Sequence, residues 1–542
     1  MAIPADQIKD KLFYNQKNSS LRMSDVELAK AYEFCEDYKH YLDDAKTERE
    51  AVDVTIGILE KNGFVPLEYG KKYAAGDKVY YNNRGKALIC ATIGSRPLTD
   101  GLRIAIAHID CPRIDLKPNP LYESSELAYF KTHYYGGIKK YQWTTVSLSA
   151  HGVIVKKDGT KVTVCIGEDE SDPAFCILDL LPHLAREQSS RTLADGIRGE
   201  ELNILLGSNC YRGDDISEPV KTNILNILFE KYGVTEEDFL SAELTFVPAA
   251  KARDIGLDRS MIGAYGHDDR VCAYTELMAI LDTSAPEYTA VSVFADREEI
   301  GSIGNTGMRS ELLRNFVNAL CMAENLPSWL VLQNSKCFSA DVSAAFDPTF
   351  PDVCEFRNTA RLGYGAVIMK YTGSGGKSGT SEASAEFMAF VRNLLDSKTL
   401  SGRPASSARW MQAAAELLLS LSPIWTLTLL TLACPCFPCT LLLRSYPKQT
   451  FTTPISHLNI SLNKHIRAAQ KCTQKRKHRL NPPASAGGFN AWRSPPSVQT
   501  CTEAMFSFAR LIRAARIYFS PEFLFSEIIF FVSFYFLHHN SR

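Results

Sequence analysis

The sequence lacks an overall excess of basic residues, which is the simplest signature of a nucleic-acid-binding protein. Its 542 residues carry a formal net charge of −1 at pH 7. The balance is uneven, because residues 1–400 hold 44 basic and 57 acidic residues, whereas residues 401–542 hold 16 basic and 4 acidic ones and no Asp. Phosphate backbones are bound by basic surfaces, so the acidic first 400 residues argue against nucleic acid as a partner.

Paired cysteines and an apolar leader are also missing. Ten of the 15 Cys residues fall before position 401, scattered and without paired spacing. This pattern is typical of free thiols in a reducing compartment rather than of a disulfide framework. The N-terminus, MAIPADQIKDKLF, is too charged for the apolar core of a signal peptide. We therefore expect a cytoplasmic protein.

The order of strand-like and helix-like segments predicts an α/β fold with an insertion. Capping boxes at Ser24–Glu27 and Thr47–Glu50 predict two N-terminal helices. Residues 112–250 alternate between apolar and polar positions with many turns, which is typical of β structure. Strand–helix alternation returns from residue 265 and includes an expected strand over Trp329–Leu332 and a helix over 380–395. We expect a catalytic α/β domain (1–111 and 252–400), a β-rich inserted domain (112–251) and an atypical tail (401–542).

Four polar clusters follow apolar strands or open helices, and they are His108–Asp110, Gly266–Arg270, Asp296–Gly301 and Ser339–Asp341. Taken singly, each has an ordinary explanation, such as a structural His at a strand end, a solvated turn or the exposed start of a loop. Taken together, several carboxylates and one imidazole at strand ends are costly to bury unless they coordinate a cation. Such a donor set suits zinc, manganese or cobalt.

The stretches AHIDCPRIDLKPNPL, YGHDDR, DREEIGS and SADVSAAFDPTFPD resemble, in order and spacing, the motifs of the aspartyl aminopeptidase family, over about residues 20–397. Members of that family are co-catalytic two-metal exopeptidases. The resemblance implies a mixed-sheet α/β/α metallopeptidase domain with an inserted β-rich dimerisation domain. It also implies two divalent ions, zinc first and manganese or cobalt as alternatives, and peptide substrates. The expected assembly is a dimer-based homo-oligomer, for which a dodecamer is one candidate.

The resemblance assigns roles to residues of the four clusters. The implied metal ligands are His108, Asp268, Glu299 and Asp341. Asp268 would bridge both metals, His108 and Asp341 would complete metal 1, and Glu299 would bind metal 2. Glu298 would be the general base that deprotonates the attacking water, and Asp110 would orient the His108 imidazole.

Two further residues match family positions outside these clusters. His183 matches a residue of the inserted domain that reaches the active site of a neighbouring subunit, and a surface helix His explains it equally well. Lys370 stands where the family places a cation for acidic P1 side chains, with a solvated strand-end Lys as the alternative. The family's Trp-Phe-Asp-Arg-Asp stretch is replaced by Gln142-Trp-Thr-Thr-Val146, so a neutral or broader P1 preference stays open beside an acidic one.

The family's last metal-2 ligand, a His in a Met-His-x-Pro-Phe-Glu stretch, is missing from the tail. Residues 422–443 form instead an uncharged apolar run, long enough for a membrane span of ~20 residues. Back-translated with allowed codons and read one nucleotide out of frame, residues 432–455 can encode Met-His-Ser-Pro-Phe-Glu, and the His codon straddles Cys439 and Thr440. With allowed codons, the same shift can turn residues 401–421 into a Gly-rich stretch. We therefore expect a frame slip near residues 397–401, a disordered tail and no membrane association.

Three functions follow from these observations. The first is a metal-dependent aminopeptidase that removes N-terminal residues, acidic ones among them. The second is a catalytically weak or inactive family member that only assembles, because the fifth ligand is missing. The third is a membrane-anchored protein defined by its tail, which the out-of-frame match disfavours.

Overall fold

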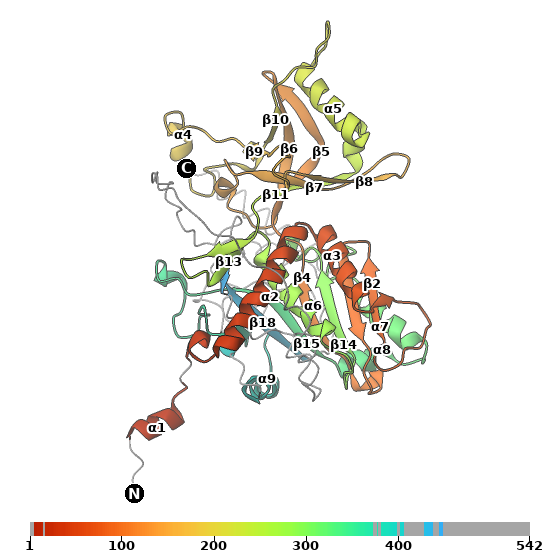
Figure 1. Ribbon diagram of the computed structural model, residues 1–542, viewed down its shortest axis with the longest axis vertical. Helices are drawn as coiled ribbons and strands as arrows, with labels where there is room; N and C mark the ends of the chain where they lie inside the picture. Colours follow the sequence, from red (N-terminus) through yellow and green to blue (C-terminus); the bar gives the residue numbers. More distant parts are fainter. Residues whose placement is uncertain are drawn as a thin grey trace, which may run out of the picture.

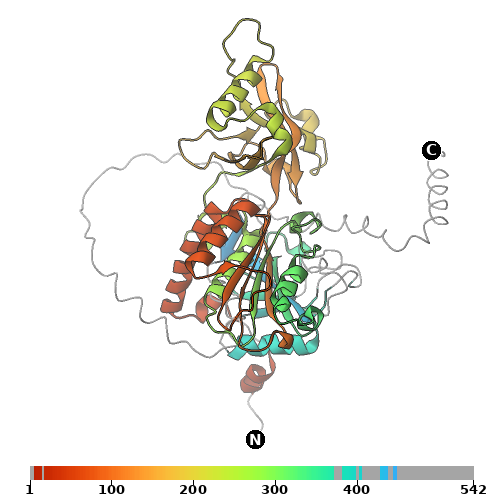
Figure 2. The ribbon, with the colours of Figure 1, turned by 90° about the vertical axis from the view of Figure 1, so that its right-hand side faces the viewer.

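The protein has two lobes, and the computed structural model shows the smaller lobe standing above the larger one (Figures 1 and 2). The structure describes residues 5–14, 17–371, 377, 381–397, 402–405, 428–436 and 444–447. The chain enters the upper lobe after β4 (Arg103–His108) and leaves it after β11 (Ala242–Pro248). The upper lobe is therefore an insertion into the lower one.

A nine-stranded mixed sheet forms the centre of the lower lobe, in the order β1-β2-β3-β14-β4-β15-β18-β16-β17. Besides β4 and the tail strands β17 and β18, its strands are β1 (Val65–Pro66), β2 (Lys78–Asn83), β3 (Ala87–Thr92), β14 (Ala290–Ala295), β15 (Lys336–Ala344) and β16 (Ala366–Met369). Strands β14, β4, β15 and β18 run parallel to one another. Their carboxyl ends therefore share one edge of the sheet, where polar residues that follow the strands can meet.

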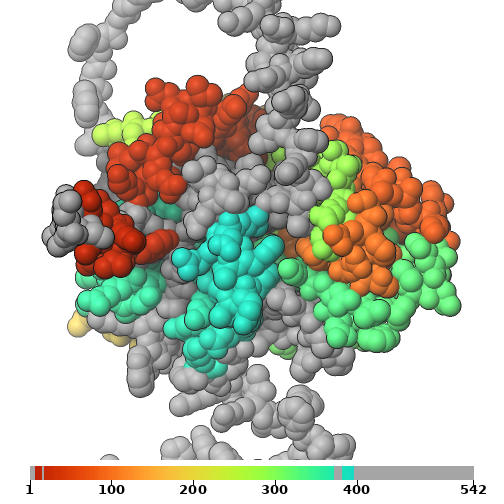
Figure 3. Space-filling view, turned by 90° about the horizontal axis from the view of Figure 1, so that it is seen from below, coloured from red at the N-terminus to blue at the C-terminus, as the bar shows by residue number. Residues whose placement is uncertain are grey.

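Helices cover both faces of this sheet. One face carries α2 (Asp25–Asp44), α3 (Glu48–Lys61), α6 (His267–Leu281) and α9 (Ala385–Ser397), and the other carries α7 (Leu312–Met322) and α8 (Ser328–Gln333). The strand period of two divides the core, because Ala105 and Ala107 of β4 join the first cluster and Ile104 and Ile106 join the second. Seen from below, α9 lies on the surface of the lobe (cyan, Figure 3), and α1 (Ala5–Leu12) extends beneath the lobe (Figure 1). The predicted α/β/α fold is confirmed.

The upper lobe is built on a seven-stranded antiparallel sheet, in the order β8-β7-β11-β5-β6-β10-β9. Besides β11, its elements are β5 (Arg113–Ser124), β6 (Leu127–Tyr135), β7 (Leu148–Val155), β8 (Lys161–Ile166), β9 (Cys176–Ile177), α4 (Arg186–Ser189), β10 (Ile204–Gly207) and α5 (Pro219–Tyr232). Apolar side chains from alternate strand positions, Phe246 among them, pack with Trp143, which follows a short 3-10 helix, to form a separate core. The insertion is β-rich, as its alternating pattern predicts.

The described part of the tail contributes the strands β17 (Gly402–Ala405), β18 (Thr428–Cys436) and β19 (Arg444–Pro447). Strand β18 pairs with β15 along its whole length, and β19 pairs with β13 (Met261–Ala264), which lies beside β12 (Arg253–Ile255). The expectation of a disordered tail is therefore wrong for these segments. For β18 the reason is that an uncharged apolar run can complete a buried sheet. The rest of 401–542 lies outside the described residues.

The apolar run 422–443 was a candidate membrane span, and part of it lies in the described chain. Residues 428–436 of this run form the strand β18 rather than a helix. Within the described segments, no helix is long and apolar enough to cross a membrane.

Local sequence signals account for the first helices of the lower lobe. Both predicted capping boxes form, at the starts of α2 and α3, where Ser24 and Thr47 accept hydrogen bonds from the backbone N–H three residues later. The strand predicted over Trp329–Leu332 is wrong, because this run lies in α8. A four-residue apolar run has no period that separates helix from strand, and the neighbouring strand, β15, begins only at Lys336.

Candidate metal centre

Six of the predicted site residues meet at the carboxyl edge of the central sheet. They are His108, Asp110, Asp268, Glu298, Glu299 and Asp341, supplied by the end of β4, the start of α6, the turn after β14 and the strand β15. His108 and Ala295, the last residues of β4 and β14, are paired in the sheet. Parallel strands thus bring together side chains that lie up to 233 positions apart in the chain.

The donor atoms of this cluster lie close enough to share a cation. His108 Nε2 lies 3.2 Å from Asp268 Oδ1, 3.8 Å from Glu298 Oε2 and 3.9 Å from Asp341 Oδ1. Two groups have ligand atoms that all lie within 4.8 Å of one another, His108 with Asp268 and Asp341, and His108 with Glu298 and Glu299. Zinc bonds to nitrogen and oxygen are about 2.0–2.2 Å long, so one ion can contact every member of the first group.

The hydrogen bonds of His108 fix which ring nitrogen faces the carboxylates. Its Nδ1 lies 2.9 Å from the backbone carbonyl of Asp110, and a carbonyl can only accept. Nδ1 therefore carries a hydrogen, and Nε2 points into the cluster. A histidine ligand oriented by a hydrogen bond on its other nitrogen is the usual arrangement at protein metal sites.

The carboxylates of the cluster are crowded; those of Glu298 and Asp341 are buried, and those of Asp268 and Glu299 are half-buried. Burial raises the pKa of Asp341 and of Glu299 well above the usual range, and the charges of Asp268 and Glu298 raise both further. Burial opposes charge on His108 as well, but Asp110, Asp268 and Glu298 raise its pKa well above its usual value. Within the described residues, Asp341 Oδ2 is buried without a hydrogen-bond partner. A divalent cation would supply the missing positive charge, so the donor set fits such an ion.

Asp110 connects the two halves of the cluster. Its Oδ1 accepts a hydrogen bond of 3.0 Å from the backbone N–H of Glu298, and its Oδ2 accepts one of 3.2 Å from that of Glu299. Oδ2 also accepts a 2.8 Å hydrogen bond from the Tyr135 hydroxyl. Asp110 thus holds His108 through its carbonyl and the Glu298–Glu299 turn through its carboxylate.

The other two predicted residues lie outside the cluster. His183 lies in an exposed turn of the upper lobe, between β9 and α4. Lys370 is exposed and follows β16, and its carbonyl accepts a hydrogen bond from Ala383 N–H. Conversely, two residues of the centre were not predicted: Tyr135, and Cys111, whose thiol donates to the carbonyl of Asp268 at 2.7 Å. Neither residue belongs to a spacing pattern that marks a metal site.

Comparison with known proteins finds relatives over most of the chain. Residues 41–400 match the family model of the aminopeptidase I zinc metalloprotease (M18). A "Probable M18 family aminopeptidase 1" of Clostridium acetobutylicum is 48% identical over 411 residues, which cover 74% of this chain and 87% of that protein. The crystal structure of aminopeptidase I from the same species superposes with a TM-score of 0.79 at 41% identity, over 84% of this chain and 100% of that one. The mApe1 dodecamer of S. cerevisiae shares the fold, with a TM-score of 0.63 at 18% identity over 80% of this chain and 96% of that one.

Proposed function

The chain belongs to the aminopeptidase I zinc metalloprotease (M18) family, and we propose that it removes N-terminal residues from peptides with Glu298 as the general base. The observation that carries this proposal is the convergence of one imidazole and four carboxylates at the carboxyl edge of the central sheet.

The residues divide into a complete and an incomplete ligand set. His108, Asp268 and Asp341, whose ligand atoms lie together, would hold the first ion. Asp268 and Glu299 would hold a second, as the family resemblance implies. Zinc is the ion of the family, and manganese or cobalt would suit the same donors. A divalent ion bound here would polarise the scissile carbonyl and lower the pKa of the attacking water.

Glu298 is placed to move the proton. Its side chain is buried, with Oε2 3.8 Å from His108 Nε2, and its backbone N–H is held by Asp110. A carboxylate fixed beside the centre can take a proton from the attacking water and pass it to the leaving amine. Replacing Glu298 by Gln keeps the shape of the side chain and removes this capacity.

Substrate selection would follow from charge. The free α-amine of a peptide would be held at one of the two metal positions, which restricts cleavage to the N-terminal bond. Lys370 would favour an acidic first side chain, whereas the Gln142–Val146 stretch, which replaces the family's Trp-Phe-Asp-Arg-Asp, supports a broader preference. Hydrolysis of Asp, Glu, Leu and Lys arylamides separates these two preferences, and a Lys370→Ala variant tests the role of the cation.

The inserted lobe would make the protein a homo-oligomer. Leucines around His183 leave more than half of their surface exposed, and they are Leu178, Leu180, Leu181 and Leu184. Such a patch is typical of a protein–protein interface, and mApe1, which shares this fold, is a dodecamer. In such an assembly, His183 would reach the metal centre of a neighbouring subunit. We expect the protein to act in the cytoplasm.

The other candidate function is an aminopeptidase of weak activity, because the second metal position lacks a ligand. Two protein ligands, Asp268 and Glu299, are fewer than the three of a catalytic zinc site. We infer that the missing His is encoded one nucleotide out of frame, at Cys439 and Thr440. Strand β18 supports this, because it ends at Cys436 beside the Asp341-bearing β15, at the edge that carries the other ligands. If no frame of the coding nucleotides encodes Met-His-Ser-Pro-Phe-Glu, this inference fails.

The proposed activity is tested on the full-length chain after a chelator has removed its metal. Adding zinc should restore hydrolysis of aminoacyl arylamides, weakly for the chain as it stands. A Glu298→Gln variant should keep its zinc and lose turnover, whereas Glu311→Gln, the same change at an exposed position, should match the unchanged protein. Equal turnover by the Glu298→Gln variant would exclude Glu298 as the base.

A further inference from the structure

The upper lobe reaches the metal centre at the end of β6. Tyr135, the last residue of that strand, donates a 2.8 Å hydrogen bond to Asp110 Oδ2. The next residue, Gly136, also borders the centre, because a Cβ built on it would lie 3.2 Å from Glu299 Oε2. The inserted lobe therefore forms part of the wall of the site within a single chain.

Asp110, which accepts the hydrogen bond from Tyr135, also orients other residues of the metal centre. Asp110 is fully buried, and the same Oδ2 that accepts from Tyr135 accepts from the backbone of Glu299. The other oxygen accepts from the backbone of Glu298, and the carbonyl accepts from His108. A change in the orientation of the Asp110 carboxylate would therefore move the general base and a metal ligand together.

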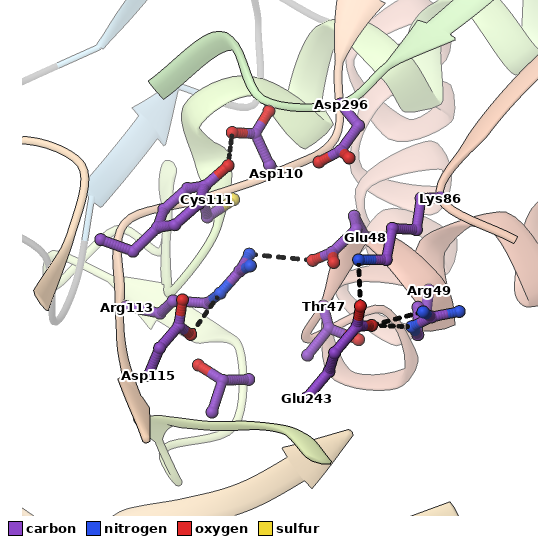
Figure 4. Close-up of polar contacts among 12 residues, drawn as sticks. Thr47, Glu48, Arg49, Lys86, Asp110, Cys111, Arg113, Asp115, Glu243 and Asp296 are labelled. Atoms are coloured by element: carbon purple, nitrogen blue, oxygen red, sulfur yellow. Dashed lines mark hydrogen bonds and ion pairs between the residues drawn. The ribbon is translucent and has the colours of Figure 1, made fainter. Parts of the chain in front are cut away.

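Tyr135 is itself fixed by a cation. The guanidinium carbon of Arg113 lies 4.0 Å from the centroid of the Tyr135 ring, a distance at which cation–π attraction is effective. Arg113 Nη1 donates to Glu48 Oε2 at 2.8 Å, and Nε donates to Asp115 Oδ1 at 2.8 Å (Figure 4). Glu48 belongs to the first turn of α3 in the lower lobe, so both lobes hold the arginine that holds the ring.

Building on the proposed function, we infer that Tyr135 is a positioning residue of the aminopeptidase centre, which acts through Asp110 on both His108 and the Glu298–Glu299 turn. Arg113 and Glu48 complete the series of contacts by keeping the Tyr135 ring in place. The orientation of the inserted lobe on the lower lobe thus contributes to metal binding, in addition to any role of that lobe in assembly.

The test compares zinc binding by full-length variants, measured by competition with a chromophoric chelator. Tyr135→Phe removes only the hydroxyl and keeps the ring on Arg113. Loss of a residue that orients a ligand costs about 10–100-fold in metal affinity, so the zinc Kd of this variant should rise by that factor. The visible spectrum of the cobalt-loaded protein should change as well. Tyr134→Phe, the same change at a half-exposed neighbour in β6, should leave both unchanged.

A second variant tests the link through the arginine. Glu48→Gln should weaken zinc binding in the same direction, and the double variant with Tyr135→Phe should lose less than the product of the two single losses, because both act through one series of contacts. The inference would be overturned if the two losses of zinc affinity multiply in the double variant. It would also be overturned if the Tyr135→Phe variant binds zinc as tightly as the Tyr134→Phe variant. Either result would leave the proposed function intact. Failure of the unchanged protein to bind zinc would overturn both.

Discussion

Replacing His151 by Gln should loosen the junction between the two lobes. His151 lies in β7 of the upper lobe and is 2% exposed. Its Nδ1 lies 2.7 Å from Oε1 of Glu50, which belongs to α3 of the lower lobe, and its Nε2 lies 3.2 Å from Oε1 of Glu168. Lys251 contacts the other oxygen of Glu168 at 2.7 Å. An imidazolium between two carboxylates therefore joins the lobes.

The structure sets the size of the expected effect. Burial alone would lower the pKa of His151, but contacts with Cys165, Glu168 and Glu50 raise it to about 11. The cation is therefore present in the folded protein at neutral pH. Removing one member of a buried ion pair leaves an uncompensated charge, which costs about 3–5 kcal/mol of unfolding free energy. The Gln amide can still donate one hydrogen bond, so we expect about 3 kcal/mol.

The effect should depend on pH with a definite sign. Because the folded-state pKa of His151 is raised above the unfolded value of 6.5, its contribution is complete below pH 6.5 and is lost as the pH rises through about 11. Glu168 behaves oppositely, since its pKa is lowered from 4.5 to about 2, and its contribution is lost only as the pH falls through that range. The difference between the two proteins should therefore be largest near pH 6 and much smaller near pH 10.

Urea unfolding followed by circular dichroism at both pH values measures this difference. His133→Gln, the same change at an exposed position in β6, should shift the unfolding free energy by less than about 0.5 kcal/mol. A His151→Gln cost that is the same at both pH values, or no larger than that of the control, would refute the charged junction.

Three other changes have expected outcomes. Gly136→Ala should raise the zinc Kd about 10-fold, because the new Cβ would approach Glu299. It should also lower the unfolding free energy by about 1 kcal/mol, because the backbone φ at this position is +74°. Gly137→Ala, whose new Cβ would meet nothing within 4 Å, is the control in the same assays. Glu276 is fully buried, neither of its carboxylate oxygens has a hydrogen-bond partner among the described residues, and burial raises its pKa well above 4.5. The contribution of Glu276 to the unfolding free energy is therefore present below pH 4.5 and lost as the pH rises. At pH 8 the Glu276→Gln variant should be more stable in urea than the unchanged protein by at least about 1 kcal/mol, the value of one pKa unit. Near pH 4.5 it should be no more stable. Restoring the reading frame after residue 397 should raise tightly bound zinc from one to two ions per chain, and unchanged stoichiometry by metal analysis would contradict the missing-ligand explanation.

Signals that lie close together in the sequence predicted the fold well. The capping boxes at Ser24 and Thr47 mark the first turns of α2 and α3, because the side chains that satisfy the free N–H groups lie within three residues. Apolar runs that end on His108 and Ala295 mark strands, and parallel pairing carries the following polar residues to one edge. The short run Trp329–Leu332 was misassigned because its four residues do not distinguish the two periods.

Contacts between distant parts of the chain could not be predicted in this way. The pairing of β18 with β15 depends on which strand edge is free in the folded sheet. Glu50 and His151 are 101 residues apart, and nothing in either neighbourhood marks the other. Tyr135 is only 25 residues from Asp110, but its hydroxyl meets that carboxylate only because β5 and β6 return the chain to the centre.

Anomalous scattering at the zinc edge, from crystals of the full-length protein grown with zinc, tests the central claim most directly. A peak should lie about 2.0–2.2 Å from His108 Nε2 and from one oxygen each of Asp268 and Asp341, with any second peak on the Glu299 side at lower occupancy. A zinc peak elsewhere, with none between these three side chains, would contradict the assignment of the carboxyl edge of the sheet as the aminopeptidase centre.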